Sequence, residues 1–301
     1  MAGALTPPAV AIRQLAGSDL PAAAALSAAV GWNQSAADWR RLHALAARGC
    51  LGAWRGAELV GTATLVDYAG RVAWLGMVIV AAAERGRGLG GRLVEEALAL
   101  AGGGGDGGGG GDGATVVGLD ATDLGAPLYE RAGFVTVALI DRWGGRLRPG
   151  TAPAAASRST RTRRLTAADL PAVAALDAAV TAVDRAALLH HLLQEDDVAV
   201  HGAFTANGLA AFAALRPGRE AAHLGPFIAT DGEARAAVMA AVAREAAGAP
   251  VLVDVVRGEG KAELLAGAGL NVTRTLRRMT RPALPVMTAV GVVAATAFEW
   301  G

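Results

Sequence analysis

Residues 74–98 read WLGMVIVAAAERGRGLGGRLVEEAL, and this stretch constrains the fold more than any other. The apolar residues up to Val80 predict a buried strand, and those from Leu93 onward recur with helical spacing. Between them lies a loop with glycines at 86, 88, 90 and 91 and arginines at 85 and 87. Glycines let consecutive backbone N–H groups face one anion, and the start of a helix adds positive potential. The stretch therefore predicts a binding site for a diphosphate.

The same glycines raise an alternative. Gly86, Gly88 and Gly91 satisfy G-x-G-x-x-G, a pattern of dinucleotide-binding folds. That pattern belongs after the first strand of a parallel β-α-β unit, about 20 residues before an acidic residue. Here it follows strands predicted over residues 51–55, 58–68 and 72–80, whose short turns indicate an antiparallel meander. Downstream lies a glycine tract, residues 102–113, which we expect to be a surface insertion. The context therefore argues against a dinucleotide fold.

An internal repeat predicts the domain organisation. Residues 12–30 read IRQLAGSDLPAAAALSAAV and residues 162–180 read TRRLTAADLPAVAALDAAV, at an offset of 150 residues. In both, an Arg-bearing strand leads to Asp-Leu-Pro and an Ala-rich helix, with Asp19 and Asp169 at the predicted N-cap position. The matched Arg, Asp and Pro are not explained by alanine richness. We predict two copies of one domain, residues 1–148 and 161–301, joined by a linker at residues 149–160.

A second motif lies later in the first copy, where residues 128–134 read LYERAGF. The segment RGRGLG at residues 85–90 resembles the [Q/R]-x-x-G-x-[G/A] signature of the GNAT superfamily of acyl-CoA-dependent N-acyltransferases. Residues 128–134 are similar to its later motif, in which a Tyr on a short helix precedes Gly-Phe and the final strand. The resemblance covers residues 10–142 well and the rest more weakly. It implies an α/β (α+β) fold of two tandem GNAT-like domains, each a mixed, mainly antiparallel sheet flanked by helices.

The resemblance also implies roles for individual residues. The diphosphate of acetyl-CoA would be held by Arg85, Gly86, Arg87, Gly88, Leu89, Gly90 and Gly91. Pantetheine would pair with the strand residues Met77, Val78, Ile79 and Val80, one of whose N–H groups would face the thioester carbonyl. Tyr129 would protonate the departing CoA thiolate.

The acceptor amine must lose a proton before it attacks, because an alkyl ammonium has a pKa of about 10.4. Glu84, beside the loop, is the predicted base, and Asp67 and Asp120 are alternatives. Predicted contacts to the acceptor come from the turn between the first two helices, from the hairpin after the third strand and from the end of the chain. These residues are Trp32, Asn33, Asp67, Tyr68 and Glu299.

The second copy lacks both motifs. Its segment LGPFIATDGEAR, residues 224–235, aligns with the strand and loop of the first copy but keeps only Gly232 from the glycine loop. Leu265 stands opposite Tyr129. We therefore expect this copy to support the first copy or to form a wall of its acceptor pocket, and not to catalyse. Its last residues, 292–300, are predicted to form a strand.

Composition limits the classes of partner. The chain has 28 Lys and Arg against 27 Asp and Glu, a balance that offers no basic footprint for nucleic acid. Residues 1–10 lack the basic start and apolar core of a signal peptide, and the apolar segment near the end is short and contains prolines, so we expect no membrane partner and a cytoplasmic location. The single cysteine and the spacing of the five histidines predict no metal site.

The sequence thus predicts an N-acetyltransferase that moves an acetyl group from acetyl-CoA to a small-molecule or amino-acid-like amine, as a monomer or homodimer. A non-catalytic acyl-CoA-binding sensor or assembly module is the alternative. A protein or peptide acetyltransferase, which needs an open groove, is a third hypothesis.

Overall fold

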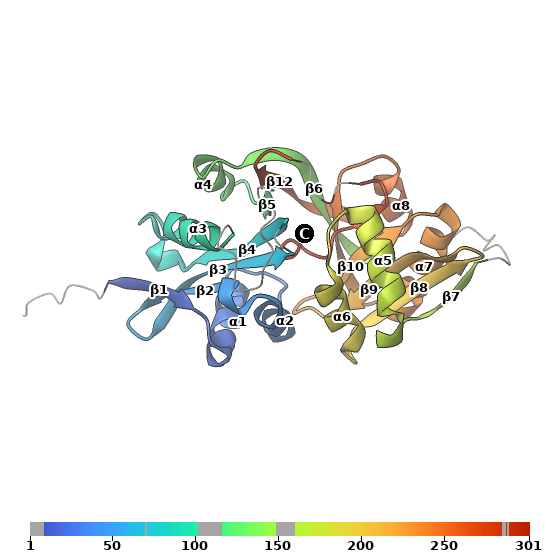
Figure 1. Cartoon of the computed structure of the whole chain (residues 1–301), viewed down its shortest axis with the longest axis horizontal. Coiled ribbons are helices and arrows are strands. Elements are labelled where there is room, and N and C mark those ends of the chain that lie inside the picture. Colours follow the sequence, from blue (N-terminus) through green and yellow to red (C-terminus); the bar gives the residue numbers. More distant parts are fainter. Residues whose placement is uncertain (1–8, 70, 102–115, 149–159, 285–286, 288) are drawn as a thin grey trace, which may run out of the picture. The chain divides into compact units, whose positions relative to one another are not determined.

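The computed structural model describes residues 9–69, 71–101, 116–148, 160–284, 287 and 289–301, which form two compact units (Figure 1). The first unit runs as far as Thr115 and the second from Val116 to Gly301. The expected insertion at residues 102–113 lies outside the described residues. So does the expected linker at residues 149–160, apart from its last residue.

The first unit is built on an antiparallel sheet in the order β1-β2-β3-β4. Its elements are β1 (Val10–Gln14), α1 (Leu20–Ala29), α2 (Ala36–Ala46), β2 (Cys50–Arg55), β3 (Glu58–Tyr68), β4 (Val72–Val80) and α3 (Leu89–Leu100). Short turns join β2, β3 and β4 into the predicted meander. Helix α3 packs against β3 and β4, while α1 and α2 lie on the other side of the sheet (Figure 1).

The sheet strands of the second unit lie in the order β5-β12-β6-β11-β10-β9-β8-β7, with β13 paired to β10. Its first elements are β5 (Val116–Ala121), α4 (Ala126–Arg131) and β6 (Val135–Arg146). They are followed by β7 (Arg161–Arg164), α5 (Leu170–Thr181), α6 (Ala186–Gln194), β8 (Ala199–Thr205), β9 (Gly208–Arg216), β10 (Ala222–Ala229), α7 (Gly232–Ala246), β11 (Pro250–Val256), α8 (Lys261–Gly267), β12 (Leu270–Arg281) and β13 (Val292–Ala294). Among these pairings β10 and β11 run parallel, and the others are antiparallel.

The element order confirms the repeat, because β1 to β6 with α1 to α4 recur as β7 to β12 with α5 to α8. The same ion pair recurs as well. Arg13 bonds Asp19 at 2.8 Å, and Arg163 bonds Asp169 at 2.5 Å. Each carboxylate also accepts a backbone N–H from three residues earlier, 2.9 Å away in both copies. Asp19 and Asp169 are the N-cap residues of α1 and α5, as predicted, but their side chains bond the turn that precedes each helix and not the first amides of the helix.

The last strands of the two copies are exchanged. Strand β12 of the second copy lies between β5 and β6 of the first, and β6 lies between β11 and β12. The last elements of the first copy, from β5 onward, therefore belong to the same compact unit as the second copy, and the boundary between the two units follows Thr115. The domain boundary at residues 149–160 was inferred from the sequence repeat, and it stays a prediction.

Two reciprocal ion pairs lie on the exchanged strands. Asp120 of β5 faces Arg278 of β12, and its two oxygens accept bonds of 2.9 and 2.8 Å. Asp254 of β11 faces Arg142 of β6 in the equivalent way, with two bonds of 2.7 Å. Both carboxylates are fully buried. Each copy thus supplies the aspartate of one pair and the arginine of the other.

The end of the chain differs from the expectation. The predicted strand at residues 292–300 is correct only for β13, Val292–Ala294, and turns follow it. The residues after β13 no longer pair with β10. The Ala295 N–H donates to the carbonyl of Asp254 at 2.8 Å, and the Thr296 N–H donates to the carbonyl of Gly301 at 3.0 Å, which closes a turn at the end of the chain. Among the described residues, none of the helices has the length and apolar character needed to cross a bilayer.

We predict that the exchanged strands depend on the buried pairs. Asp120→Asn removes the carboxylate charge from the fully buried Arg278 and should lower the free energy of unfolding by about 3–5 kcal/mol. The double variant Asp120→Leu with Arg278→Met should recover most of this loss, because apolar side chains of similar volume need no partner. Urea unfolding followed by circular dichroism measures both. A loss below about 1 kcal/mol in Asp120→Asn would show that the pair behaves like a surface pair.

Candidate functional site

The glycine loop after β4 is open to solvent. Residues 85–88 are exposed, and Gly86 and Gly88 have φ of +75° and +78°, in the left-handed region. A Cβ at either glycine would meet no atom within 4 Å. The glycines are therefore required by the backbone conformation and not by crowding. The structure leaves room above the loop.

Helix α3 begins at this loop without an acceptor from a side chain. Its N-cap is Gly88, which has no side chain to bond the first amides of the helix. Leu93 and Val94 are buried and anchor the helix to the sheet. The unbonded N–H groups and the dipole of such a helix start attract an anion. The exposed Arg85 and Arg87 add formal positive charge beside it.

Glu84, the predicted base, lies in the short helical turn Ala82–Glu84 before the loop. Its carboxylate accepts bonds of 2.8 and 2.6 Å from Arg55 at the end of β2, and Arg87 lies 3.5 Å away. The hydrogen bond from Arg55, with its charge and that of Arg87, lowers the pKa of Glu84 although burial opposes this. The geometry favours a residue that ties the loop to β2 over one that accepts a proton.

Strand β4 contains a bulge before the loop. Thr64 of β3 faces Gly76 and Thr62 faces Ile79, so Met77 and Val78 together oppose Ala63. Met77 has a φ of +48°, which is unusual for a residue with a side chain. Met77 and Ile79 are buried, whereas Val78 and Val80 are partly exposed. The four strand residues predicted to contact pantetheine therefore lie at and after an irregular point of the strand.

The second copy fills the equivalent helix start. Helix α7 begins after Asp231, whose carboxylate accepts a 2.7 Å bond from the Ala234 N–H. An anionic side chain thus already occupies the position that is open at α3. Gly232 has a helical backbone with open space around it and forms no loop.

The second copy also closes its own strand bulge. Strands β9 and β10 shift register between Leu224 and Phe227, as β3 and β4 do in the first copy. Phe227 and Ile228 pair with β13, and a Cβ at Gly225 would overlap the carbonyl oxygen of Ala295. The chain's own backbone therefore covers β10 where the first copy has Met77 to Val80.

Tyr129, the predicted acid, lies on α4 in the second unit. Its ring meets Phe134 edge to face, with centroids 6.1 Å apart. Desolvation raises the pKa of the Tyr129 phenol above its ordinary value, at which the phenol is already protonated at neutral pH. Its counterpart Leu265 is a buried core residue without a proton to give. The role of Tyr129 stays a prediction.

The predicted acceptor contacts are divided between the units. Trp32 is partly buried and Asn33 is buried in the turn between α1 and α2. Asp67 is exposed and Tyr68 is buried at the end of β3. Glu299 belongs to the second unit, where its carboxylate lies 3.7 Å from the buried Arg216. The first four residues therefore share a unit with the glycine loop, and their contact with an acceptor stays a prediction.

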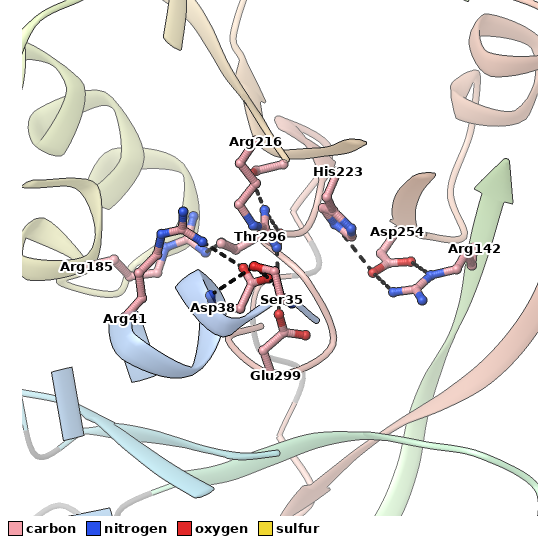
Figure 2. A network of polar contacts seen from close by, with 11 residues as sticks. Ser35, Asp38, Arg41, Arg142, Arg185, Arg216, His223, Asp254, Thr296 and Glu299 are labelled. Atoms are coloured by element: carbon pink, nitrogen blue, oxygen red, sulfur yellow. Dashed lines mark hydrogen bonds and ion pairs between the residues drawn. The ribbon is translucent and has the colours of Figure 1, made fainter. Parts of the chain in front are cut away.

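A buried polar cluster in the second unit was not predicted from the sequence. Figure 2 shows Arg142 and His223 on either side of Asp254, with the imidazole Nε2 3.6 Å from the carboxylate. Burial, followed by the charges of Arg216 and Arg142, holds the pKa of His223 well below its usual value. Arg216 donates 3.0 Å bonds to the carbonyls of Gly225 and Thr296. The repeat could have revealed Arg142 and Asp254, because it aligns them with Arg278 and Asp120.

A metal site and a reactive cysteine are not found in the described parts of the chain. No group of three or more His, Cys, Asp or Glu there is arranged to hold a metal ion. Cys50 is buried in β2, and burial raises the pKa of its thiol to about 12. The glycine loop with α3 is therefore the best-defined candidate site.

Comparisons with known proteins identify the same family in both halves of the chain. Residues 13–134 match the model of the acetyltransferase (GNAT) family, and residues 173–288 match that of an acetyltransferase (GNAT) domain. No curated protein matches the chain in sequence at a significant level.

Solved structures share the whole architecture. A protein from Pyrococcus horikoshii is 18% identical with a TM-score of 0.78, covering 100% of this chain and 99% of its own. A GCN5-related N-acetyltransferase from Sphaerobacter thermophilus has 16% identity, a TM-score of 0.63 and coverages of 94% and 100%. A tandem GNAT protein from the clavulanic acid biosynthesis pathway has 15% identity, a TM-score of 0.61 and coverages of 92% and 99%. These identities show the fold alone. Because GNAT models match both halves of a chain with this tandem fold, the protein belongs to the GNAT acetyltransferase superfamily.

Proposed function

We propose that this protein is an N-acetyltransferase that uses acetyl-CoA as donor and a small-molecule or amino-acid-like amine as acceptor. One observation carries the proposal: α3 starts at exposed left-handed glycines without a side-chain acceptor, whereas Asp231 bonds the equivalent helix start of the second copy. Acetyl-CoA would therefore bind the first copy only.

The residues around the loop suit a diphosphate. The amides at the start of α3 would bond its oxygens, and Arg85 and Arg87 would offset its charge. Arg85 is already anchored, because its Nε donates to the carbonyl of Val80 at 3.1 Å. Glu84 would hold the loop in its open form through Arg55. The loop thus needs little ordering on binding, and this favours affinity.

The chemistry requires the management of two protons. The amine nitrogen forms a bond to the acetyl carbon, the carbon–sulfur bond breaks, and the thiolate needs a proton. Tyr129 would give that proton, since a phenol is protonated at neutral pH and its position on α4 matches the family motif.

The second proton must leave the amine. The pKa of an alkyl ammonium lies about three units above pH 7, so forming the neutral, reactive amine costs about 4 kcal/mol. Glu84 and Asp120 are each held by an arginine through two hydrogen bonds, so neither can accept a proton without disturbing that pair. We assign the removal of this proton to water at the acceptor site, which Trp32 and Asn33 would border.

We predict that acetyl-CoA raises the melting temperature of the protein and that Gly88→Trp abolishes the rise. A side chain at Gly88 fills the open space over α3 and disfavours its φ of +78°. Gly260→Trp is the matched control, because Gly260 is the N-cap of α8, has a φ of +71° and is equally uncrowded. Thermal unfolding measures both. No rise with the intact protein, or equal losses in the two variants, would contradict the proposal.

Asp231 should be a cap and nothing more. Asp231→Ala removes the bond to the Ala234 N–H and should lower the free energy of unfolding by about 1 kcal/mol. The affinity for acetyl-CoA should not change, because the donor binds the other copy. Urea unfolding and calorimetric titration test the two parts. A marked loss of acetyl-CoA affinity in this variant would place the donor in the second copy.

Tyr129→Phe separates catalysis from binding. Phe keeps the edge-to-face contact with Phe134 but has no proton to give, so turnover should fall about 100-fold or more while acetyl-CoA binding is retained. A screen of amines and amino acids, with thiol detection of released CoA, supplies the substrate for this comparison. Unchanged turnover in the variant would remove Tyr129 from the mechanism. An intact protein that binds acetyl-CoA but releases CoA with no amine would instead be the non-catalytic sensor.

A further inference from the structure

The strand before the glycine loop holds a strained residue in place. The bulge of β4 puts Met77 in the left-handed region, with a φ of +48°. An unbranched residue with a Cβ adopts this conformation at a cost in free energy, so the surroundings must stabilise it. The bulge also interrupts the regular pairing with β3, which shifts register between Thr62 and Thr64.

Thr62 supplies the stabilising contact. Its side chain is fully buried, and its hydroxyl donates a 2.8 Å hydrogen bond to the carbonyl oxygen of Met77. The peptide between Met77 and Val78 is not among the cis bonds of the described residues, and in a trans peptide the C=O and N–H point in opposite directions. Anchoring this carbonyl therefore directs the Val78 N–H away from the Thr62 side chain.

Thr64 lies two residues further along β3, on the same face as Thr62. It is also fully buried. Its hydroxyl, however, has no hydrogen-bond partner in the part of the chain that the structure describes. The same strand thus contains one threonine that bonds the bulge and one that does not.

The second copy has the bulge but not this contact. Phe212 faces Ile228 as Thr62 faces Ile79, and the position of Thr64 is taken by Ala214. Pro226 stands where the first copy has Met77. The hydroxyl contact therefore occurs only in the copy with the open glycine loop. Because both copies share the fold but only the first has the Thr62 contact, we connect this contact with the glycine loop.

We propose that Thr62 is a positioning residue that fixes the Met77 peptide so that the Val78 N–H can donate to the thioester carbonyl of acetyl-CoA. This rests on the proposed function, because it concerns the same donor site. A backbone donor held in advance stabilises the negative charge that develops on that oxygen when the amine attacks. Thr62 itself touches no reacting atom.

The test compares two probes, acetyl-CoA and CoA, because CoA lacks the thioester carbonyl. In Thr62→Val, which keeps the shape but removes the donor, the affinity for acetyl-CoA should fall about tenfold while that for CoA changes less than about twofold. Thr62→Ser keeps a hydroxyl and should restore most of the acetyl-CoA affinity. Thr64→Val is the matched control and should change neither. Isothermal titration calorimetry measures all four proteins.

The outcomes distinguish the inference from the proposed function. An intact protein that binds neither probe contradicts the proposed function. If the intact protein binds both, equal losses for the two probes in Thr62→Val, or no loss, overturn the role of Thr62. An equal effect of Thr64→Val would overturn it too. If Thr62→Val does not fold, Thr62→Ala replaces it. The role of Thr62 would then be overturned if the ratio of the acetyl-CoA affinity to the CoA affinity were the same in Thr62→Ala as in the intact protein.

Discussion

The architecture depends on two buried ion pairs that the copies exchange. Asp120 with Arg278 and Asp254 with Arg142 occupy equivalent places on β5, β12, β11 and β6. A buried carboxylate requires a well-placed partner, and here each copy supplies the partner for the other. The pairs join the exchanged strands at directly opposed positions of the register. They also commit Asp120 to structure, although its position in sequence had suggested a base.

Because the two copies share one fold, any functional difference between them must come from local differences in structure. The start of α3 has left-handed glycines and open space, whereas the start of α7 has Asp231 bonded to its own helix. The bulge of β4 is held by Thr62, whereas that of β10 is covered by β13. These departures concern backbone donors in both cases. The first copy has no side-chain acceptor at the start of α3, whereas the second copy bonds the start of α7 with Asp231 and covers its bulge with β13.

Local structure was largely predictable from the sequence. Strands 58–68 and 72–80 were expected with the bounds that the structure has, because turn residues flank clear apolar runs. The strand exchange was not predictable, since it rests on pairs 112 and 158 residues apart. The pairing of Glu84 was not predictable for the same reason: its partner Arg55 lies 29 residues earlier on another strand. The bulge at Met77 likewise leaves no mark in a uniformly apolar strand.

Hydrogen exchange of the backbone amides, measured by mass spectrometry with and without acetyl-CoA, shows which of the two helix starts binds the diphosphate. It reports on the donors themselves at both helix starts of one intact chain. We predict slower exchange on binding in peptides that cover residues 85–92, and unchanged exchange over residues 231–237. Protection over residues 231–237, or none over residues 85–92 in a protein that binds acetyl-CoA, would contradict this prediction.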